Sequence, residues 1–235
     1  MEFVISHLAK SYGKHEVLQD CDYAFEEGKI YGLLGRNGAG KTTLFNCLNS
    51  DIDINGGEFF FKEGDKKEKV DSETIGYVLS TPTVPDFLTG REFIRFFMDI
   101  PSDELKDPKT IDEYMDYVRI PEDTRDRLMK DYSHGTKNKM QMLLNIIAGP
   151  KLMLLDEPLT SLDVVVAEEM KDILREQKEG RVIIFSTHIL DIALDLCDEI
   201  ILLNHGRLEH VDKENLGDEA FKIKIIEALK DADDT

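Results

Sequence analysis

The sequence predicts an α/β fold with a mostly parallel core sheet, an antiparallel β layer beside it and a helical subdomain insertion. Apolar runs of strand length recur along the 235 residues with helical patterns between them, which is typical of a parallel sheet. The early strand-like segments at 2–8, 16–25, 57–61 and 74–79 are joined by short turns, which favours the antiparallel layer. From about residue 89 to residue 130 the pattern is helical and punctuated by prolines, which indicates the insertion.

These patterns divide one predicted domain, residues 1–235, into three parts. Residues 1–80 and 150–211 form the core with its antiparallel layer, residues 81–149 the helical subdomain, and residues 212–235 a peripheral tail. In the subdomain, a capping-box pattern at Thr89 and Glu92 precedes Phe93, Phe96 and Phe97, which are expected to share one helical face.

The composition excludes several classes of protein. Hydrophobic residues make up 41% of the chain and charged residues 33%, which is typical of globular rather than disordered proteins. No apolar run approaches the ~20 residues that span a bilayer, and no signal peptide is visible, so we expect a cytosolic protein without direct lipid insertion. The net charge of −19 argues against nucleic acid as a partner. Cys21, Cys47 and Cys197 are far apart and are expected to be buried thiols.

The strongest functional signal is a glycine-rich turn at residues 35–43, between the apolar run 30–34 and the helix-like run 44–48. Glycines let the backbone wrap around an anion, and a helix that begins there adds partial positive charge. Lys41 would reach the β- and γ-phosphates, and the Thr42 hydroxyl would ligate Mg²⁺. This pattern predicts a nucleoside triphosphate site of the P-loop type rather than an empty βα turn. Its expected ligand-binding residues are Gly35, Asn37, Gly38, Ala39, Gly40, Lys41, Thr42 and Thr43.

Later in the chain, the apolar strand 151–157 ends in two carboxylates. Asp156 at its tip is placed to hold the Mg²⁺ shell, and Glu157 is free to polarise a water for attack on the γ-phosphate. His188 follows another strand, at the sheet edge where α/β folds bind ligands, and could donate a hydrogen bond to the γ-phosphate. The expected catalytic residues are Glu157, His188 and Lys41, and the expected metal ligands include Thr42 and Asp156.

Residues 132–136, with Ser133 and Gly135, precede a helix-like run at 139–148. Taken alone, this segment indicates only an ordinary cap at the start of a helix. In series with the other motifs, it makes the chain from residue 4 to about residue 211 resemble the nucleotide-binding subunit of an ABC transporter. The stretch 185–208 is similar to the ATPases of bacterial ABC-2-type, drug or bacteriocin exporters.

The resemblance implies roles that the residue pattern alone does not give. Tyr12 matches the aromatic residue that stacks on adenine, and residues 132–136 match the signature motif that closes on ATP held by the opposite subunit. The expected ligand-binding residues therefore also include Tyr12, Ser133, Gly135 and, from the D-loop at the dimer interface, Asp163. The family's cofactors are ATP and Mg²⁺. Its partners are a transmembrane permease subunit and a second ATPase subunit (homodimer or sibling), paired head to tail on the cytoplasmic face of the cell membrane.

Two departures from the family pattern bear on function. His134 and Thr136 stand where the signature usually has Gly and Gln, but Ser133 and Gly135 keep the phosphate-contacting atoms, so we expect a working but slower site. Ser80 stands where the family's Q-loop has Gln, which reaches Mg²⁺ and reports ATP occupancy to the membrane subunit. Ser80 is shorter and would act through a bridging water as the third metal-site residue. Whether it replaces Gln functionally stays open.

Two other functions are alternatives to transport. Soluble ABC ATPases that act on nucleic acid or ribosomes usually carry two cassettes or a long coiled-coil insertion, whereas this chain has one cassette, a short insertion and a charge of −19. A small-molecule kinase needs an acceptor pocket and leaves the signature and His188 unexplained. The sequence favours the ATPase subunit of an exporter. It leaves open the cargo, import against export beyond the resemblance, and homodimer against heterodimer.

Overall fold

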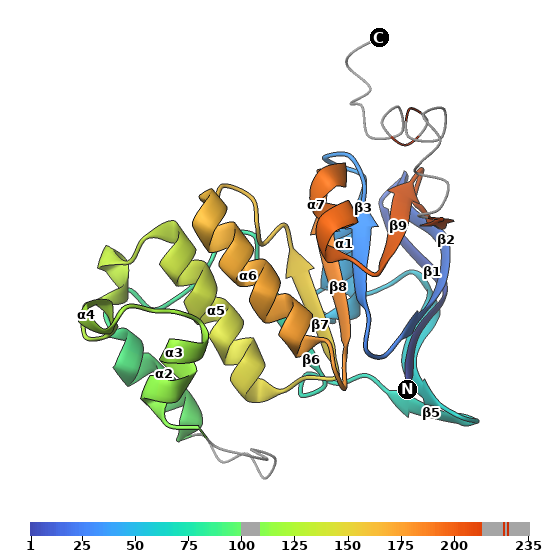
Figure 1. The fold of residues 1–235 in the computed structure, drawn as a ribbon. Helices are drawn as coiled ribbons and strands as arrows, with labels where there is room; N and C mark the ends of the chain where they lie inside the picture. Colours follow the sequence, from blue (N-terminus) through green and yellow to red (C-terminus); the bar gives the residue numbers. More distant parts are fainter. Residues whose placement is uncertain (100–108, 213–222, 224, 226–235) are drawn as a thin grey trace.

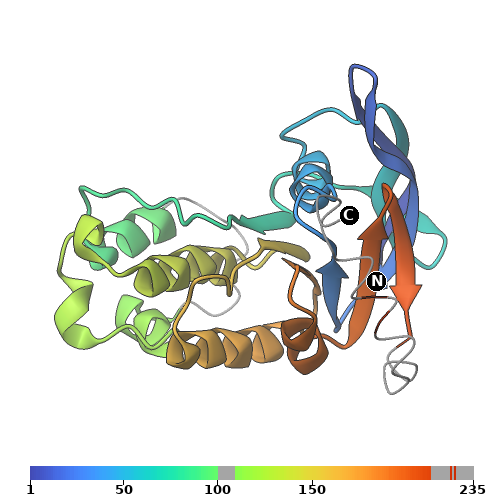
Figure 2. The ribbon, with the colours of Figure 1, turned by 90° about the horizontal axis from the view of Figure 1, so that it is seen from above.

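The structure is a computed structural model that describes residues 1–99, 109–212, 223 and 225, and the structural statements below concern those residues. Two β-sheets lie beside a lobe built mainly of helices (Figures 1 and 2). The predicted α/β class, with a mostly parallel sheet, an antiparallel sheet and inserted helices, is confirmed. The predicted tail lies outside the described residues except at Asp212, Ile223 and Ile225.

The larger sheet has the strand order β10-β9-β3-β8-β7-β6, and its pairs are parallel except for β9 with β10 at one edge. β3, β7 and β8 are buried along their whole length, which explains why they read as nearly continuous apolar runs. The strands are β3 Ile30–Leu34, β6 Ile75–Val78, β7 Leu152–Asp156, β8 Val182–Thr187, β9 Glu199–Asn204 and β10 Arg207–Val211.

The smaller sheet is antiparallel, in the order β2-β1-β4-β5. Its strands are β1 Glu2–Tyr12, β2 His15–Glu26, β4 Gly56–Glu63 and β5 Lys66–Lys69. The prediction that segment 74–79 belongs to this layer is wrong, because β6 pairs in parallel with β7 in the larger sheet. The prediction rested on grouping this segment with the other early strand-like runs. Instead, Gly76 leaves room for Asn145 of α5 (His134–Ala148), and this packing holds β6 at the edge of the core sheet.

The described helices surround the larger sheet and build most of the second lobe (Figure 1). They are α1 Lys41–Leu48, α2 Gly90–Met98, α3 Ile111–Tyr117, α4 Glu122–Arg125, α5, α6 Val164–Gln177 and α7 Leu190–Leu196, with a 3₁₀ helix at Met129–Asp131. The predicted capping box at Thr89 and Glu92 begins α2. Phe93, Phe96 and Phe97 all lie on α2 at helical spacing, but they are not equally buried: Phe93 and Phe97 pack against the core, whereas Phe96 is 64% exposed.

Alternate residues of the buried strands face opposite sides of the larger sheet and build two hydrophobic clusters. On β7, Met153 and Leu155 join the cluster that includes α5 and α6. Leu152 and Leu154 join the cluster formed with α1 and the antiparallel sheet. All three cysteines are buried, as predicted: Cys21, Cys47 and Cys197. Among the described residues, no helix has both the length and the apolar composition needed to cross a bilayer.

Candidate functional site

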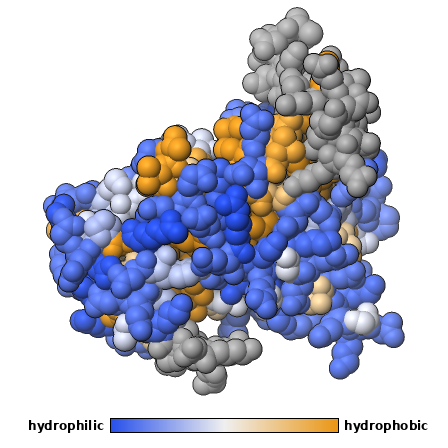
Figure 3. Space-filling view, viewed as in Figure 1, coloured by the Kyte–Doolittle hydropathy of each residue, from blue (hydrophilic) through white to orange (hydrophobic). Residues whose placement is uncertain are grey.

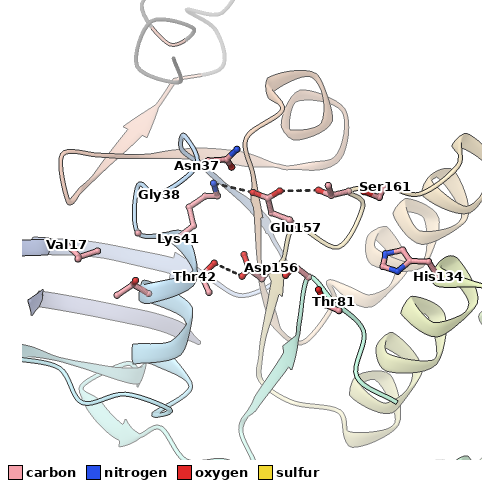
Figure 4. A pocket seen from close by; sticks show the side chains of 14 residues that line it. Val17, Asn37, Gly38, Lys41, Thr42, Thr81, His134, Asp156, Glu157 and Ser161 are labelled. Carbon is pink, nitrogen blue, oxygen red and sulfur yellow. Dashed lines mark hydrogen bonds and ion pairs between the residues drawn. The ribbon is translucent and has the colours of Figure 1, made fainter. Parts of the chain in front are cut away.

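The carboxyl ends of β3, β7 and β8 meet at one edge of the larger sheet. Their parallel register places Leu34 beside Thr187 and Asp156 beside Ser186. The glycine-rich turn follows β3 and the two carboxylates lie at the end of β7, so these distant segments converge (Figure 4). His188 follows β8 and contacts Glu157. This is the edge at which parallel α/β sheets commonly bind ligands.

The glycine-rich turn wraps around the ammonium group of Lys41. Lys41 Nζ donates hydrogen bonds to the carbonyl oxygens of Gly35 at 2.8 Å and Arg36 at 3.2 Å, and the Lys41 side chain is only 6% exposed. α1 begins directly after Gly40, whose φ of 107° places it in a region that side chains rarely adopt. A tight turn into a helix N-terminus leaves backbone N–H groups unpaired, and these groups favour a bound anion.

Asp156 forms the floor of the site, with each carboxylate oxygen bonded to a hydroxyl. The Thr42 hydroxyl donates to Oδ2 at 2.7 Å and the Ser186 hydroxyl to Oδ1 at 2.6 Å. The Asp156 side chain is buried, so these two bonds fix the plane of its carboxylate. A carboxylate oxygen beside a hydroxyl oxygen is the donor set that Mg²⁺ prefers, and Thr42 and Asp156 therefore fit a magnesium ion.

The Glu157 carboxylate lies between a lysine and a histidine. Its Oε1 is 3.3 Å from Lys41 Nζ, and its Oε2 accepts hydrogen bonds from His188 Nδ1 at 2.9 Å and from the Thr160 hydroxyl at 3.1 Å. Partial burial raises the pKa of Glu157, but the hydrogen bond from His188 and the charge of Lys41 outweigh it. The pKa therefore lies below its ordinary value of 4.5. The carboxylate stays ionised at neutral pH and able to accept a proton.

A cavity of about 700 Å³ opens over these groups (Figure 4). The predicted residues that line it are Asn37, Gly38, Gly40, Lys41, Thr42, Thr43, Ser80, Asp156 and Glu157. The sequence reasoning did not select five further lining residues, which are Val17, Thr81, His134, Thr160 and Ser161. A nucleotide-sized ligand fits a volume of this order.

Seven predicted site residues do not line the cavity: Tyr12, Gly35, Ala39, Ser133, Gly135, Asp163 and His188. Tyr12 is exposed at the end of β1. Ser133 caps α5 by accepting a hydrogen bond from the N–H of Thr136, and Asp163 caps α6 in the same way through Val166. A side chain at Gly135 would crowd Val166, at 3.0 Å.

A signal in the sequence could have identified some of the missed residues. Thr160 lies three residues after Glu157 in the turn that ends β7, within reach of its carboxylate. Ser186 lies opposite Asp156 once β7 and β8 are aligned in parallel. Val17 comes from the antiparallel sheet, and nothing in its own neighbourhood of the sequence points to the cavity.

Comparisons with known proteins agree with this geometry. The sequence profile of the ABC transporter family matches residues 18–160. The chain is 31% identical over 205 residues to the uncharacterized ABC transporter ATP-binding protein YxlF of Bacillus subtilis, covering 87% of this chain and 68% of that protein. It is 30% identical over 227 residues to the lantibiotic transport ATP-binding protein SrtF of Streptococcus pyogenes, and the match covers 94% of this chain and 96% of that protein.

Solved structures show the same fold. A structure titled as cbiO1 from Clostridium perfringens, part of the ABC transporter complex cbiONQ, has a TM-score of 0.76 at 25% identity, covering 95% of this chain and 93% of that one. A structure titled as the ATP-binding subunit of an ABC transporter has a TM-score of 0.80 at 21% identity, and the match covers 96% of this chain and 100% of that one. With the profile match extending over the glycine-rich turn and the strand-end carboxylates, the chain belongs to the ABC transporter family, as one of its ATP-binding and ATP-hydrolysing subunits.

Proposed function

We propose that this ATPase subunit powers an exporter, with Lys41, Glu157 and His188 at its centre of hydrolysis. The observation that carries the assignment is the Glu157 carboxylate, held in the cavity between Lys41 Nζ and His188 Nδ1. A general base must lie within reach of the reacting water and stay ionised, and the lowered pKa of Glu157 meets the second condition.

The glycine-rich turn would bind the phosphates of ATP. Its N–H groups and the Lys41 ammonium would take the β- and γ-phosphates, and the Thr42 hydroxyl and the Asp156 carboxylate would hold Mg²⁺. When bound, the ion neutralises charge on the phosphates. Ser80 lines the same cavity, which supports its place as a further residue near the metal. Gly35 and Ala39 would contribute through the conformation of the turn.

ABC ATPases dimerise, and we propose that the partner of this chain is a second copy or a sibling subunit. Ser133, Gly135 and Asp163 would meet the ATP held by that partner, and Tyr12 would stack on adenine in its own chain. Apolar surface supports an interface next to Asp163, because Val164 and Val165 at the start of α6 are 79% and 68% exposed. Apolar side chains gather at this end of α6 in the space-filling view (Figure 3).

ABC ATPases work with transmembrane subunits, and we propose that a permease holds this chain at the cytoplasmic face of the cell membrane. The surface near Ser80 and along α2 would dock it, since Phe87 and Phe96 are 78% and 64% exposed there. Export is favoured by the similarity to SrtF, which is named for lantibiotic transport. A role on nucleic acid or ribosomes is not favoured, because the curated relatives are named transporter ATP-binding proteins.

The test of the site compares Glu157→Gln with the unchanged chain in ATP binding, ATP hydrolysis and size-exclusion chromatography. We expect the variant to bind ATP, to lose about 10²- to 10⁴-fold in turnover and to accumulate as an ATP-bound dimer. Near-normal turnover would remove Glu157 from the role of base. Affinity capture from detergent-solubilised membranes tests the transport assignment, which requires a multi-span membrane protein to co-purify.

A further inference from the structure

We propose that Ser186 is the positioning residue that orients both acidic residues at the end of β7. This inference rests on the roles proposed above for Asp156 and Glu157. Ser186 is fully buried on β8, directly opposite Asp156 in the parallel register. Side chains at paired positions of adjacent strands point to the same face of a sheet, so the hydroxyl lies beside the carboxylate.

One hydroxyl makes both contacts at once. Ser186 Oγ donates to Asp156 Oδ1 at 2.6 Å and accepts the backbone N–H of Glu157 at 3.0 Å. A hydroxyl has one proton to donate and two lone pairs to accept with, so the two bonds do not compete. The bond to the carboxylate involves a charged acceptor and is short, which marks it as the stronger of the two.

The backbone of Glu157 depends on this support. Its φ of 47° is left-handed, which is unfavourable for a residue with a side chain. The conformation is held at the N–H by Ser186 and at the carbonyl by the N–H of Thr160, at 3.1 Å. This backbone directs the Glu157 carboxylate towards Lys41 and His188, so a change at its N–H would move the carboxylate.

Without the Ser186 hydroxyl, Thr42 is the one remaining hydroxyl that the structure places on the Asp156 carboxylate, which becomes free to rotate. The Asp156 and Glu157 carboxylates would then no longer be held in a fixed orientation relative to each other. Lys41 and the glycine-rich turn make no hydrogen bond to Ser186 among the described residues, so phosphate binding should persist. The geometry thus predicts a loss in turnover and in metal binding, with little change in nucleotide affinity.

The experiment compares two variants of equal shape in the full chain, Ser186→Thr and Ser186→Val. Both add similar volume to the buried strand, but only Thr keeps the hydroxyl. We expect kcat of the Val variant to be about 10- to 100-fold below that of the Thr variant, with KM for ATP within about two-fold. Electron paramagnetic resonance of Mn²⁺, with a non-hydrolysable ATP analogue, should show weaker Mn²⁺ binding in the Val variant. Equal kcat and equal Mn²⁺ affinity would overturn the proposal.

If the added methyl prevents folding, Ser186→Ala is compared with Thr187→Ala. Thr187 is the buried neighbour whose hydroxyl accepts the N–H of Ile189 and, within the described part of the chain, makes no hydrogen bond to either carboxylate. Loss of turnover and of Mn²⁺ affinity confined to Ser186→Ala supports the proposal, and equal loss in both variants contradicts it. Glu157→Gln in the same assay separates failure of the proposed function from failure of this inference. If Glu157→Gln stays active, the proposed function fails. If it is inactive while the two compared variants have equal turnover and equal Mn²⁺ affinity, only the inference about Ser186 fails.

Discussion

Replacing Gly40 with alanine tests whether the glycine-rich turn is constrained by the antiparallel sheet. A Cβ at Gly40 would lie 2.9 Å from Val17 Cγ1 of β2, and the residue has a φ of 107°. Gly38 is the matched control, since its φ is 77° but a Cβ there would meet nothing within 4 Å. Both substitutions therefore strain the backbone, and only the one at Gly40 also creates a steric overlap.

We expect Gly38→Ala to lower the free energy of unfolding by about 1 kcal/mol, the usual cost of a left-handed residue with a side chain. Gly40→Ala should lower it by about 3 kcal/mol, because a β-branched valine cannot rotate away freely and crowding adds about 1–3 kcal/mol. For a chain of this size, the difference of about 2 kcal/mol corresponds to about 4–8 °C in Tm.

The assay is thermal and urea unfolding of the nucleotide-free chain, with the double variant Val17→Ala/Gly40→Ala as a third protein. Shortening Val17 should restore part of the stability lost at Gly40, relative to Val17→Ala alone. The reasoning is refuted if Gly40→Ala is no less stable than Gly38→Ala, or if the double variant shows no such recovery.

Three further outcomes are expected. Lys41→Ala should bind ATP at least ten-fold more weakly in a fluorescent-nucleotide titration, because the turn loses its buried cation; unchanged affinity would undo the assignment of the phosphate site. The folded-state pKa of Glu157 is depressed, so its stabilising contribution is present above the ordinary value of 4.5 and lost as the pH falls through the lowered pKa. The stability advantage of the unchanged chain over Glu157→Gln should accordingly stay constant in urea unfolding from pH 7 to about pH 5.5, and shrink as the pH falls through 4.5 and the lowered pKa. Arg125 is buried and donates to the Ile120 carbonyl and to Asp112, so Arg125→Met should cost about 1–3 kcal/mol in the same assay, and a neutral result would contradict that role.

The sequence predicted the parts of the fold that depend on local pattern. The buried strands β7 and β8 and the capping box at Thr89 follow from apolar runs and side-chain chemistry close in the chain. It misplaced segment 74–79, because the place of a four-residue strand depends on segments distant in the chain: β7, with which it pairs, and Asn145, which packs against Gly76. It did not predict that Phe96 is exposed, because helical periodicity gives the spacing of a face but not which side the core will cover.

At the candidate site, the sequence predicted which residues reach the sheet edge but not which atoms meet there. Motif order placed Lys41, Asp156 and Glu157 at one edge, where the structure finds them. Sequence position makes Thr160 and Ser186 candidates, but the bonds they make depend on strand register and on a left-handed residue at 157, which the sequence pattern did not specify. Tyr12, Ser133 and Asp163 came from the family resemblance, and their roles with ATP stay predictions.

If Glu157 is the base, as proposed above, the contacts of Lys41 would link nucleotide binding to preparation of that base. A buried ammonium group needs acceptors for its three protons, and here the carbonyls of Gly35 and Arg36 and the carboxylate of Glu157 supply them. A γ-phosphate offers several charged oxygens, and we expect it to compete with Glu157 Oε1, which at 3.3 Å is the most distant of the three acceptors.

That exchange would free Glu157 Oε1 to accept a water, while His188 and Thr160 would still hold Oε2. Under the roles proposed above, phosphate binding and exposure of the base would then be one event at one ammonium group. Glu157→Gln removes the competing charge in advance, so it should bind ATP at least as tightly as the unchanged chain. Weaker binding in equilibrium titration would show that Glu157 does not compete with the phosphate for Lys41.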